Sequence, residues 1–133
     1  MSEETGKGFW DHAEVIYAYT RAQALEDGVL VDVSEIAKEA GIKFPVALTS
    51  AVHCKYVEVP AGVIGQDETG RLWDILWVFR FAAAKFNGST LLFKVHVRND
   101  NRDCMPPLVT LKAVCGPGDT PEPVITIMLP DED

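Results

Sequence analysis

The chain has few of the residues that usually mark a cofactor or a metal site. It contains only three histidines and three cysteines, without a C-x-x-C pair or the spacing of metal ligands. It has no Gly-rich phosphate loop either, because the "GPGD" stretch carries a proline and follows an apolar run without opening a helix. The sequence therefore predicts no metal, no cofactor and no catalytic residue. We expect buried free thiols at Cys54, Cys104 and Cys115.

Long hydrophobic runs are also missing. The longest candidate, residues 72–86, is interrupted by Asp74, Arg80 and Lys85. It is shorter than the roughly 18–20 apolar residues that cross a bilayer. The opening stretch "MSEETGKGFWDH" lacks the basic and then apolar order of a signal peptide. We expect a cytoplasmic protein that does not bind membranes.

Charge is present in quantity but is unevenly placed. The 133 residues include 20 acids and 12 bases, which gives a net charge of −8. Residues 42–115 carry nine bases against six acids, whereas the segments on either side are acidic. A net negative charge disfavours nonspecific binding to nucleic acids. The bases of the middle segment nevertheless predict a local cationic surface.

Helical signals occupy the first two thirds of the chain. Gly28 and Gly41 each follow a helical pattern and can end it in the left-handed conformation. Pro45 fits the first turn of a further helix, and residues 29–33 form a short extended run. The predicted helices cover residues 9–25, 34–40, 45–57 and 71–86.

The last third alternates apolar and polar residues with the period of a β-strand. The runs are "LLFKVHVR" (91–98), "LVTLKAVC" (108–115) and "VITIML" (124–129), and polar loops join them. The predicted fold is α+β, with about four N-terminal helices packed on a C-terminal three-stranded antiparallel β-meander. We expect one domain over residues 1–133, with tails at 1–8 and 130–133.

The alternation gathers cations on the polar face of the meander. Lys94, His96, Arg98 and Lys112 are the candidate ligand-binding residues, because no carboxylate occupies the strands beside them. Two other interpretations stay open. Lysine on an edge strand prevents unwanted pairing, and helices covering this face would pair the cations with acids.

Two tryptophans mark the strongest helix. Trp73 and Trp77 lie four residues apart and therefore side by side, outside the main apolar stripe. A helix that is apolar over most of its circumference is usually buried by several partners. The alternative is that the tryptophan pair serves a protein partner.

Other motifs carry less weight. Residues 34–52 resemble a helix-turn-helix, but the second half, "FPVALTSAV", lacks the polar donors that read bases. We expect a helix–glycine–helix corner there. A small hydrolase stays an alternative, and it would require convergence of Glu26, Asp27, Asp67 or His12.

Two stretches carry a family resemblance over almost the whole chain. They are "YTRAQALEDGVLVDVSEIAKEAG…FPVALTSAV" and "GQDETGRLWDILW…LVTLKAVCGPGDTPEPVITIMLPDED". The chain resembles a family of small uncharacterised bacterial proteins, a domain of unknown function often carried on plasmids and mobile elements. The resemblance implies a bacterial origin, and it carries over no activity, ligand or catalytic residue.

The leading functional prediction is a non-enzymatic protein-interaction module. Its acidic ends suggest a mobile-element accessory that acts on a host nucleic-acid-binding complex. The alternative is a domain that binds a small anionic ligand or nucleic acid on the basic sheet face. A homodimer could form through the free strand edge or the tryptophan-bearing helix.

Overall fold

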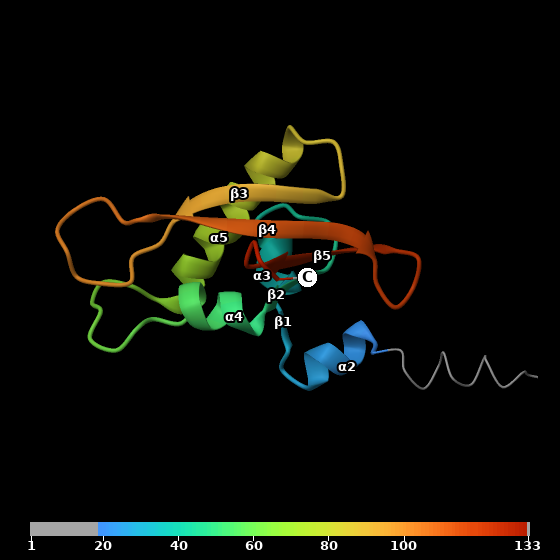
Figure 1. The fold of residues 1–133 in the computed structure, drawn as a ribbon, viewed down its shortest axis with the longest axis horizontal. Helices are drawn as coiled ribbons and strands as arrows, with labels where there is room; N and C mark the ends of the chain where they lie inside the picture. Colours follow the sequence, from blue (N-terminus) through green and yellow to red (C-terminus); the bar gives the residue numbers. More distant parts are fainter. Residues whose placement is uncertain (1–18, 133) are drawn as a thin grey trace, which may run out of the picture.

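The computed structural model describes residues 19–132 and contains a five-stranded mixed sheet (Figure 1). The strand order is β1-β2-β5-β4-β3. β2 and β5 are parallel, and the other neighbours are antiparallel. The strands are β1 (Leu30–Asp32), β2 (Val46–Thr49), β3 (Thr90–His96), β4 (Leu108–Pro117) and β5 (Pro123–Met128).

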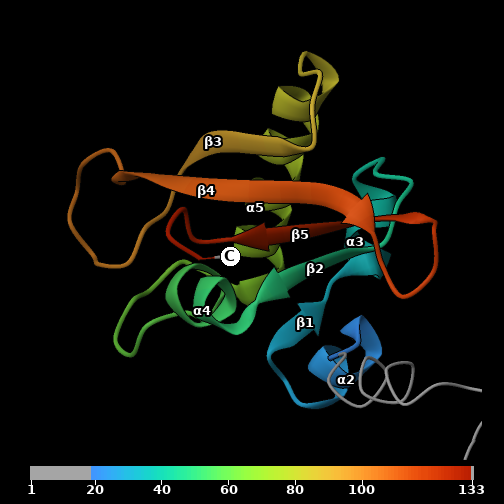
Figure 2. The same cartoon turned by 45° about the vertical axis from the view of Figure 1, so that its right-hand side comes forward.

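One long helix covers one face of this sheet, and the other helical segments are short (Figure 2). Residues 9–18 of the helix predicted at 9–25 lie outside the described residues, and α2 begins at Arg21, where Thr20 forms a capping box with Gln23. The segments are α2 (Arg21–Glu26), α3 (Ser34–Glu39), α4 (Ser50–Val52), the π-helix η1 (His53–Val57) and α5 (Glu68–Ala84).

The predicted three-stranded meander is present as β3, β4 and β5. Its strands pair without a bulge, so apolar and polar side chains alternate between the two faces of the sheet. β3 pairs with β4 from Thr90↔Val114 to His96↔Leu108, and β4 pairs with β5. Phe93 and Val95 are buried, whereas Leu92 and Lys94 are exposed. Because Lys94 pairs with Thr110 and Leu92 pairs with Lys112, the two lysines lie on the same face of the sheet.

The fold prediction of four helices on a three-stranded antiparallel sheet is wrong, because two further strands join the sheet. β2 is the main error, since residues 45–57 were expected to form one helix. Val46, Ala47 and Leu48 are all buried between β1 and β5. A strand buried on both faces shows no alternation, so its pattern cannot be distinguished from that of a buried helix. The expected helix–glycine–helix corner is therefore a helix–glycine–strand corner.

Hydrogen bonds from distant residues hold β2 in place. The Val46 amide donates to the Ser34 hydroxyl (3.1 Å), and the Val46 carbonyl accepts from the Val33 amide (3.0 Å). On the other side, the Ile125 amide donates to the Pro45 carbonyl (2.8 Å). These partners satisfy the backbone of β2 across large distances in sequence, which favours a strand over the local helix.

The central helix α5 begins at Glu68 and is capped by Asp67, whose carboxylate accepts a hydrogen bond from the Gly70 amide (3.0 Å). Ile75, Leu76 and Phe79 point from α5 into the core, where the Phe79 ring lies 5.6 Å from that of Phe93 on β3. The prediction of a central helix packed on the sheet is confirmed. Its last turn lies against the end of the sheet where β3 begins.

Candidate binding site at the end of the central helix

Three of the four predicted residues, Lys112, Arg98 and His96, make contacts within the fold. Lys112 is half-buried, and its ammonium donates to the Glu132 carbonyl in the turn after β5. The Arg98 guanidinium donates to the carbonyls of Arg102 and Cys104. His96 Nδ1 lies 2.8 Å from the Pro106 carbonyl.

This arrangement differs from the interpretation in which helices cover the basic face and pair its cations with acids. Instead of meeting carboxylates in a covered seam, Lys112 and Arg98 satisfy backbone oxygens of the loops and the C-terminal turn. Lys94 is exposed, and among residues 19–132 no acceptor lies within hydrogen-bond distance of its ammonium. Among the four predicted residues, Lys94 is therefore the one without a hydrogen-bond partner in residues 19–132. A single exposed ammonium is a weak basis for anion recognition.

Arg71 is a structural cation that sequence reasoning did not single out. Its guanidinium donates to the Val57 carbonyl (3.1 Å), to the Arg98 carbonyl and to Asn99 Oδ1 (2.6 Å). Only 6% of Arg71 is exposed, and burial lowers its pKa below the ordinary value. A lone arginine on the core side of an apolar helix was the available signal. Arg71 joins η1 to the end of β3.

Arg21 plays a similar part at the other end of the sheet. Its guanidinium donates to Thr126 Oγ1 (2.7 Å) and to the Ile125 carbonyl (2.9 Å), and its amide donates to Asp119 (2.7 Å). Burial lowers the pKa of Arg21, and the carboxylates of Asp32 and Asp119 oppose that change. The cation thus connects α2 to β5.

The candidate hydrolase residues have local structural roles. Asp27 accepts a hydrogen bond from the Tyr19 hydroxyl (2.7 Å), which raises the pKa of Tyr19. Asp67 caps α5, and Glu26 is the exposed last residue of α2. His12 lies outside the described residues. Nothing in these contacts brings a carboxylate pair to one reacting position.

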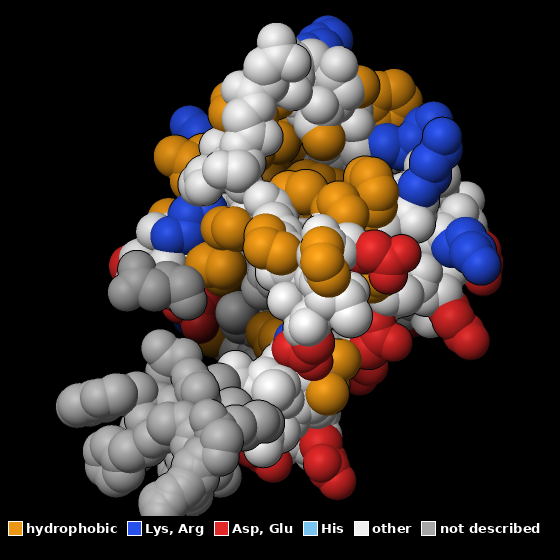
Figure 3. Space-filling view, turned by 90° about the vertical axis from the view of Figure 1, so that its right-hand side faces the viewer, with side chains coloured by type: hydrophobic (Ala, Val, Ile, Leu, Met, Phe, Trp, Pro, Cys, Tyr) orange, Lys and Arg blue, Asp and Glu red, His pale blue; other side chains and the backbone are white. Residues whose placement is uncertain are grey.

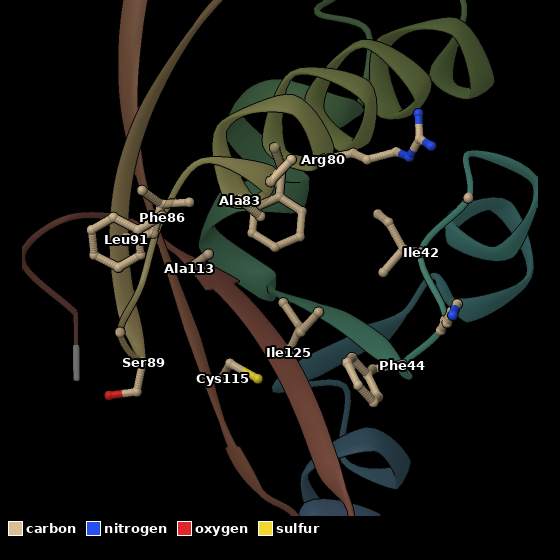
Figure 4. A pocket seen from close by; sticks show the side chains of 15 residues that line it. Ile42, Phe44, Arg80, Ala83, Phe86, Ser89, Leu91, Ala113, Cys115 and Ile125 are labelled. Carbon is tan, nitrogen blue, oxygen red and sulfur yellow. The ribbon is translucent and has the colours of Figure 1, made fainter.

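A pocket of about 360 Å³ lies at the C-terminal end of α5. Its floor is apolar and comes from the helix and the sheet together, through Phe79, Ala83, Leu91, Ala113 and Ile125 (Figure 4). The loop before β2 closes one side, and the turn before β3 closes the other. A volume of this size accommodates one large side chain or a small ligand.

Exposed aromatic rings surround the mouth of the pocket. Phe44 and Phe86 line it and are 44% and 42% exposed. Gly88 lies directly beneath the Phe86 ring, where an added Cβ would come within 2.9 Å of that ring. Figure 3 shows hydrophobic side chains gathered on one face of the molecule, with Lys and Arg on both sides of them and Asp and Glu mainly below.

A row of rings continues along the outer side of α5. Trp73 and Trp77 stack with 5.8 Å between ring centroids, and Phe81 meets Trp77 edge to face at 5.0 Å. Trp77 and Phe81 are exposed, whereas Trp73 is half-buried. We call Trp73, Trp77 and Phe81 the aromatic ladder. The predicted tryptophan pair is thus part of a larger surface, because it includes Phe81 and leads toward the pocket.

Arg80 connects the aromatic ladder to the pocket. Its guanidinium carbon lies 5.5 Å from the Trp77 ring centroid and 5.8 Å from that of Phe81, within cation–π distance. The same side chain lines the pocket and packs over Gly41, where an added Cβ would come within 2.8 Å of Arg80 Nε. Lys43 is the second cation of the lining, which contains no carboxylate.

The pocket lining is mostly apolar and contains few reactive side chains. Cys115 and Ser89 are its potential nucleophiles, and neither histidine nor carboxylate is among the lining residues to serve as their base. Cys115 is half-buried, and Cys54 and Cys104 are exposed, so the expectation of three buried thiols is wrong. Sequence reasoning missed the pocket because no local pattern joins residues 41–44, 79–91 and 113–125.

Other kinds of site are not found in the described part of the chain. Residues 19–132 contain no group of three His, Cys, Asp or Glu side chains placed to hold a metal ion. None of the helices described here has both the length and the apolar character needed to cross a membrane.

Comparison with known proteins gives a family but no function. No curated protein and no solved structure matches the chain. One family model covers residues 7–133, which is nearly the whole sequence. The chain therefore belongs to a family of unknown function, DUF6573.

Proposed function

We propose that this chain is a non-enzymatic protein-interaction module that binds its partner through the pocket and the aromatic ladder. A large apolar side chain of the partner enters the pocket, and acidic residues beside that anchor meet Arg80 and Lys43. The observation that carries this proposal is the continuity of an apolar pocket, exposed aromatic rings and two cations on one surface.

This composition is typical of the residues that dominate protein–protein binding. Tryptophan and arginine are enriched among such residues, and they cluster around pockets from which water is excluded. An exposed patch of several large rings is uncommon on a surface with no partner. A polyanion is a poorer match, because the protein has a net charge of −8 and the pocket floor is apolar.

The setting we propose is a bacterial cytoplasm, with the protein serving as an accessory of a plasmid or another mobile element. The family resemblance supports this setting. A host complex that binds nucleic acid is the proposed target, and the acidic border in Figure 3 would meet its basic surface. The partner would then carry an acid-flanked apolar anchor beside a basic region.

Peptide display tests the pocket directly and does not require the natural partner. A random peptide library is selected on the wild-type chain, and affinities of the enriched peptides are measured by calorimetry. We expect enrichment of an aromatic or large aliphatic residue flanked by Asp or Glu. Enrichment of peptides without an apolar anchor, or of none at all, would contradict the proposal.

A pair of variants on α5 supplies the control. Ala83→Met fills the pocket from its floor, whereas Ala82→Met adds the same side chain at a half-buried neighbour that does not line the pocket. The enriched peptides should bind Ala83→Met at least about tenfold more weakly and Ala82→Met nearly as well as wild type. Equal affinity for all three proteins would place the peptide elsewhere.

A further inference from the structure

The two edge strands of the sheet differ in length. β1 has three residues, whereas β3 runs for seven residues and pairs only with β4 among the described residues. All seven residues of β3 pair in an unbroken register, so neither a bulge nor a proline interrupts this edge. Long, uninterrupted edges of this kind accept a further strand unless something blocks them.

The hydrogen bonds at both ends of β3 show which of its backbone groups point outward. The Cys115 amide donates to the Ser89 carbonyl (2.8 Å), and the Val97 amide donates to the Pro107 carbonyl (3.0 Å). In an antiparallel pair, such bonded residues alternate with residues whose N–H and C=O point away from the neighbouring strand. The outward groups of β3 therefore belong to Thr90, Leu92, Lys94 and His96.

The side chains along this edge are suited to a second copy of the same edge. Leu92 is 60% exposed in the middle of β3, and Lys94 is the only residue of β3 with a permanent charge. A two-fold axis at Leu92 places Leu92 opposite itself and Lys94 opposite Thr90. An axis at Lys94 would instead place two ammonium groups directly opposite each other, which is destabilising.

We propose that two copies of this chain pair through their β3 edges, antiparallel and centred on Leu92, to form one continuous ten-stranded sheet. The outward groups of Leu92 bond to those of its counterpart, and Thr90 bonds to Lys94 across both sides of the axis. This proposal is independent of the partner proposed above, because the edge of β3 and the pocket use different groups.

The dimer has a consequence for the binding surface. A two-fold axis that joins antiparallel edges runs perpendicular to the sheet, so both α5 helices lie on the same side of the joined sheet. The two pockets therefore lie on the same side of the joined sheet, toward its opposite ends. A partner with two anchors, or a dimeric partner, is bound by both pockets and gains avidity.

Sedimentation equilibrium of the full chain tests the association. Lys94→Pro removes an outward N–H while every β3–β4 hydrogen bond is retained, so the fold survives and the dimer is lost. Leu92→Lys places two cations opposite each other and weakens the dimer at least about tenfold. Leu108→Lys, at a similarly exposed leucine on β4, leaves the dimer unchanged. A wild-type monomer at all concentrations, or equal effects of Leu92→Lys and Leu108→Lys, would overturn the proposal.

Cysteine cross-linking tests the register in a background where the three native cysteines are replaced by serine. Leu92→Cys alone forms a disulfide-linked dimer, since opposed Cα atoms lie about 5.5 Å apart. Thr90→Cys and Lys94→Cys do not cross-link alone, because their copies lie about 13 Å apart. A mixture of these two variants forms a heterodimer. Cross-linking of Lys94→Cys with itself would refute the Leu92 register.

Discussion

Arg71 and Arg80 lie on the same helix, α5, but differ in burial and in their contacts. Arg71 is buried, and its guanidinium donates to two backbone carbonyls and to Asn99. Arg80 is exposed, lies over the rings of Trp77 and Phe81, and has no hydrogen-bond acceptor within reach among residues 19–132. One arginine is used by the fold, and the other is available to a partner.

The comparison extends to the other cations. Arg21, Arg98 and Lys112 also donate to backbone carbonyls, as Arg71 does. Carboxylates lie beside basic side chains in only two contacts of the described residues, His53–Glu58 (3.4 Å) and Arg102–Asp100 (3.6 Å). The position of a basic residue in this chain therefore says little about ligand binding until its hydrogen-bond acceptors are known.

The largest expected effect comes from Arg71→Met. The substitution removes the donor to Val57, Arg98 and Asn99 and leaves the buried Val57 carbonyl without this partner, which we expect to cost about 3 kcal/mol of the free energy of unfolding. Urea denaturation measures this loss. A loss below about 1 kcal/mol would mean that Arg71 does not join η1 to β3 in solution.

Arg80→Met should change the affinity for a partner and leave the stability nearly unchanged. We expect the free energy of unfolding to change by no more than about 0.5 kcal/mol, as for most surface substitutions. The affinity for the peptides enriched by display should fall about tenfold, since the cation at the pocket mouth is lost. Urea denaturation and calorimetry on the same preparation separate the two effects. A large loss of stability with unchanged peptide affinity would show that Arg80 stabilises the fold and does not bind the peptide.

Lys112 and Lys94 provide a smaller version of the same comparison on one sheet face. Lys112→Met removes the donor to the Glu132 carbonyl and should reduce the free energy of unfolding by about 1 kcal/mol. Lys94→Met is the matched control and should change it by less than about 0.5 kcal/mol. Equal losses in thermal or urea unfolding would show that the contact with the C-terminal turn contributes nothing.

The smallest effect concerns Asp74, an acid on the same helix as the two arginines. Burial, and then the charge of Asp67, raises the pKa of Asp74 above its ordinary value. A raised carboxyl pKa means that the folded state holds its proton more tightly, so stability is lost as pH rises through that pKa. Asp74→Asn should therefore raise the Tm slightly at pH 7 and leave it unchanged near pH 3. A Tm difference that grows toward acid would contradict this sign.

The local patterns of the sequence predicted the meander and the central helix well. Alternation along β3 and β4 placed Lys94 and Lys112 on one face, and helical spacing placed Phe79 in the core. These patterns succeed because each reports one element that is apolar on one side only.

The remaining errors come from non-local interactions. β2 has no alternation because β1 and β5 flank it and both its faces are buried, and its parallel pairing with β5 joins residues that are far apart in sequence. The pocket likewise forms where three distant segments meet. Arg71 could not be assigned a role from the sequence, because its acceptors are mostly backbone carbonyls, which no residue type reveals.

Amide chemical-shift mapping by NMR tests the central claim most directly. The labelled chain is titrated with an acid-flanked aromatic peptide obtained by display. The account predicts that the largest shifts cluster at residues 41–44 and 79–91, around Arg80 and the pocket. A cluster at Lys94, His96 and Lys112 would contradict it, because the partner would then bind the sheet face whose cations are mostly used by the fold.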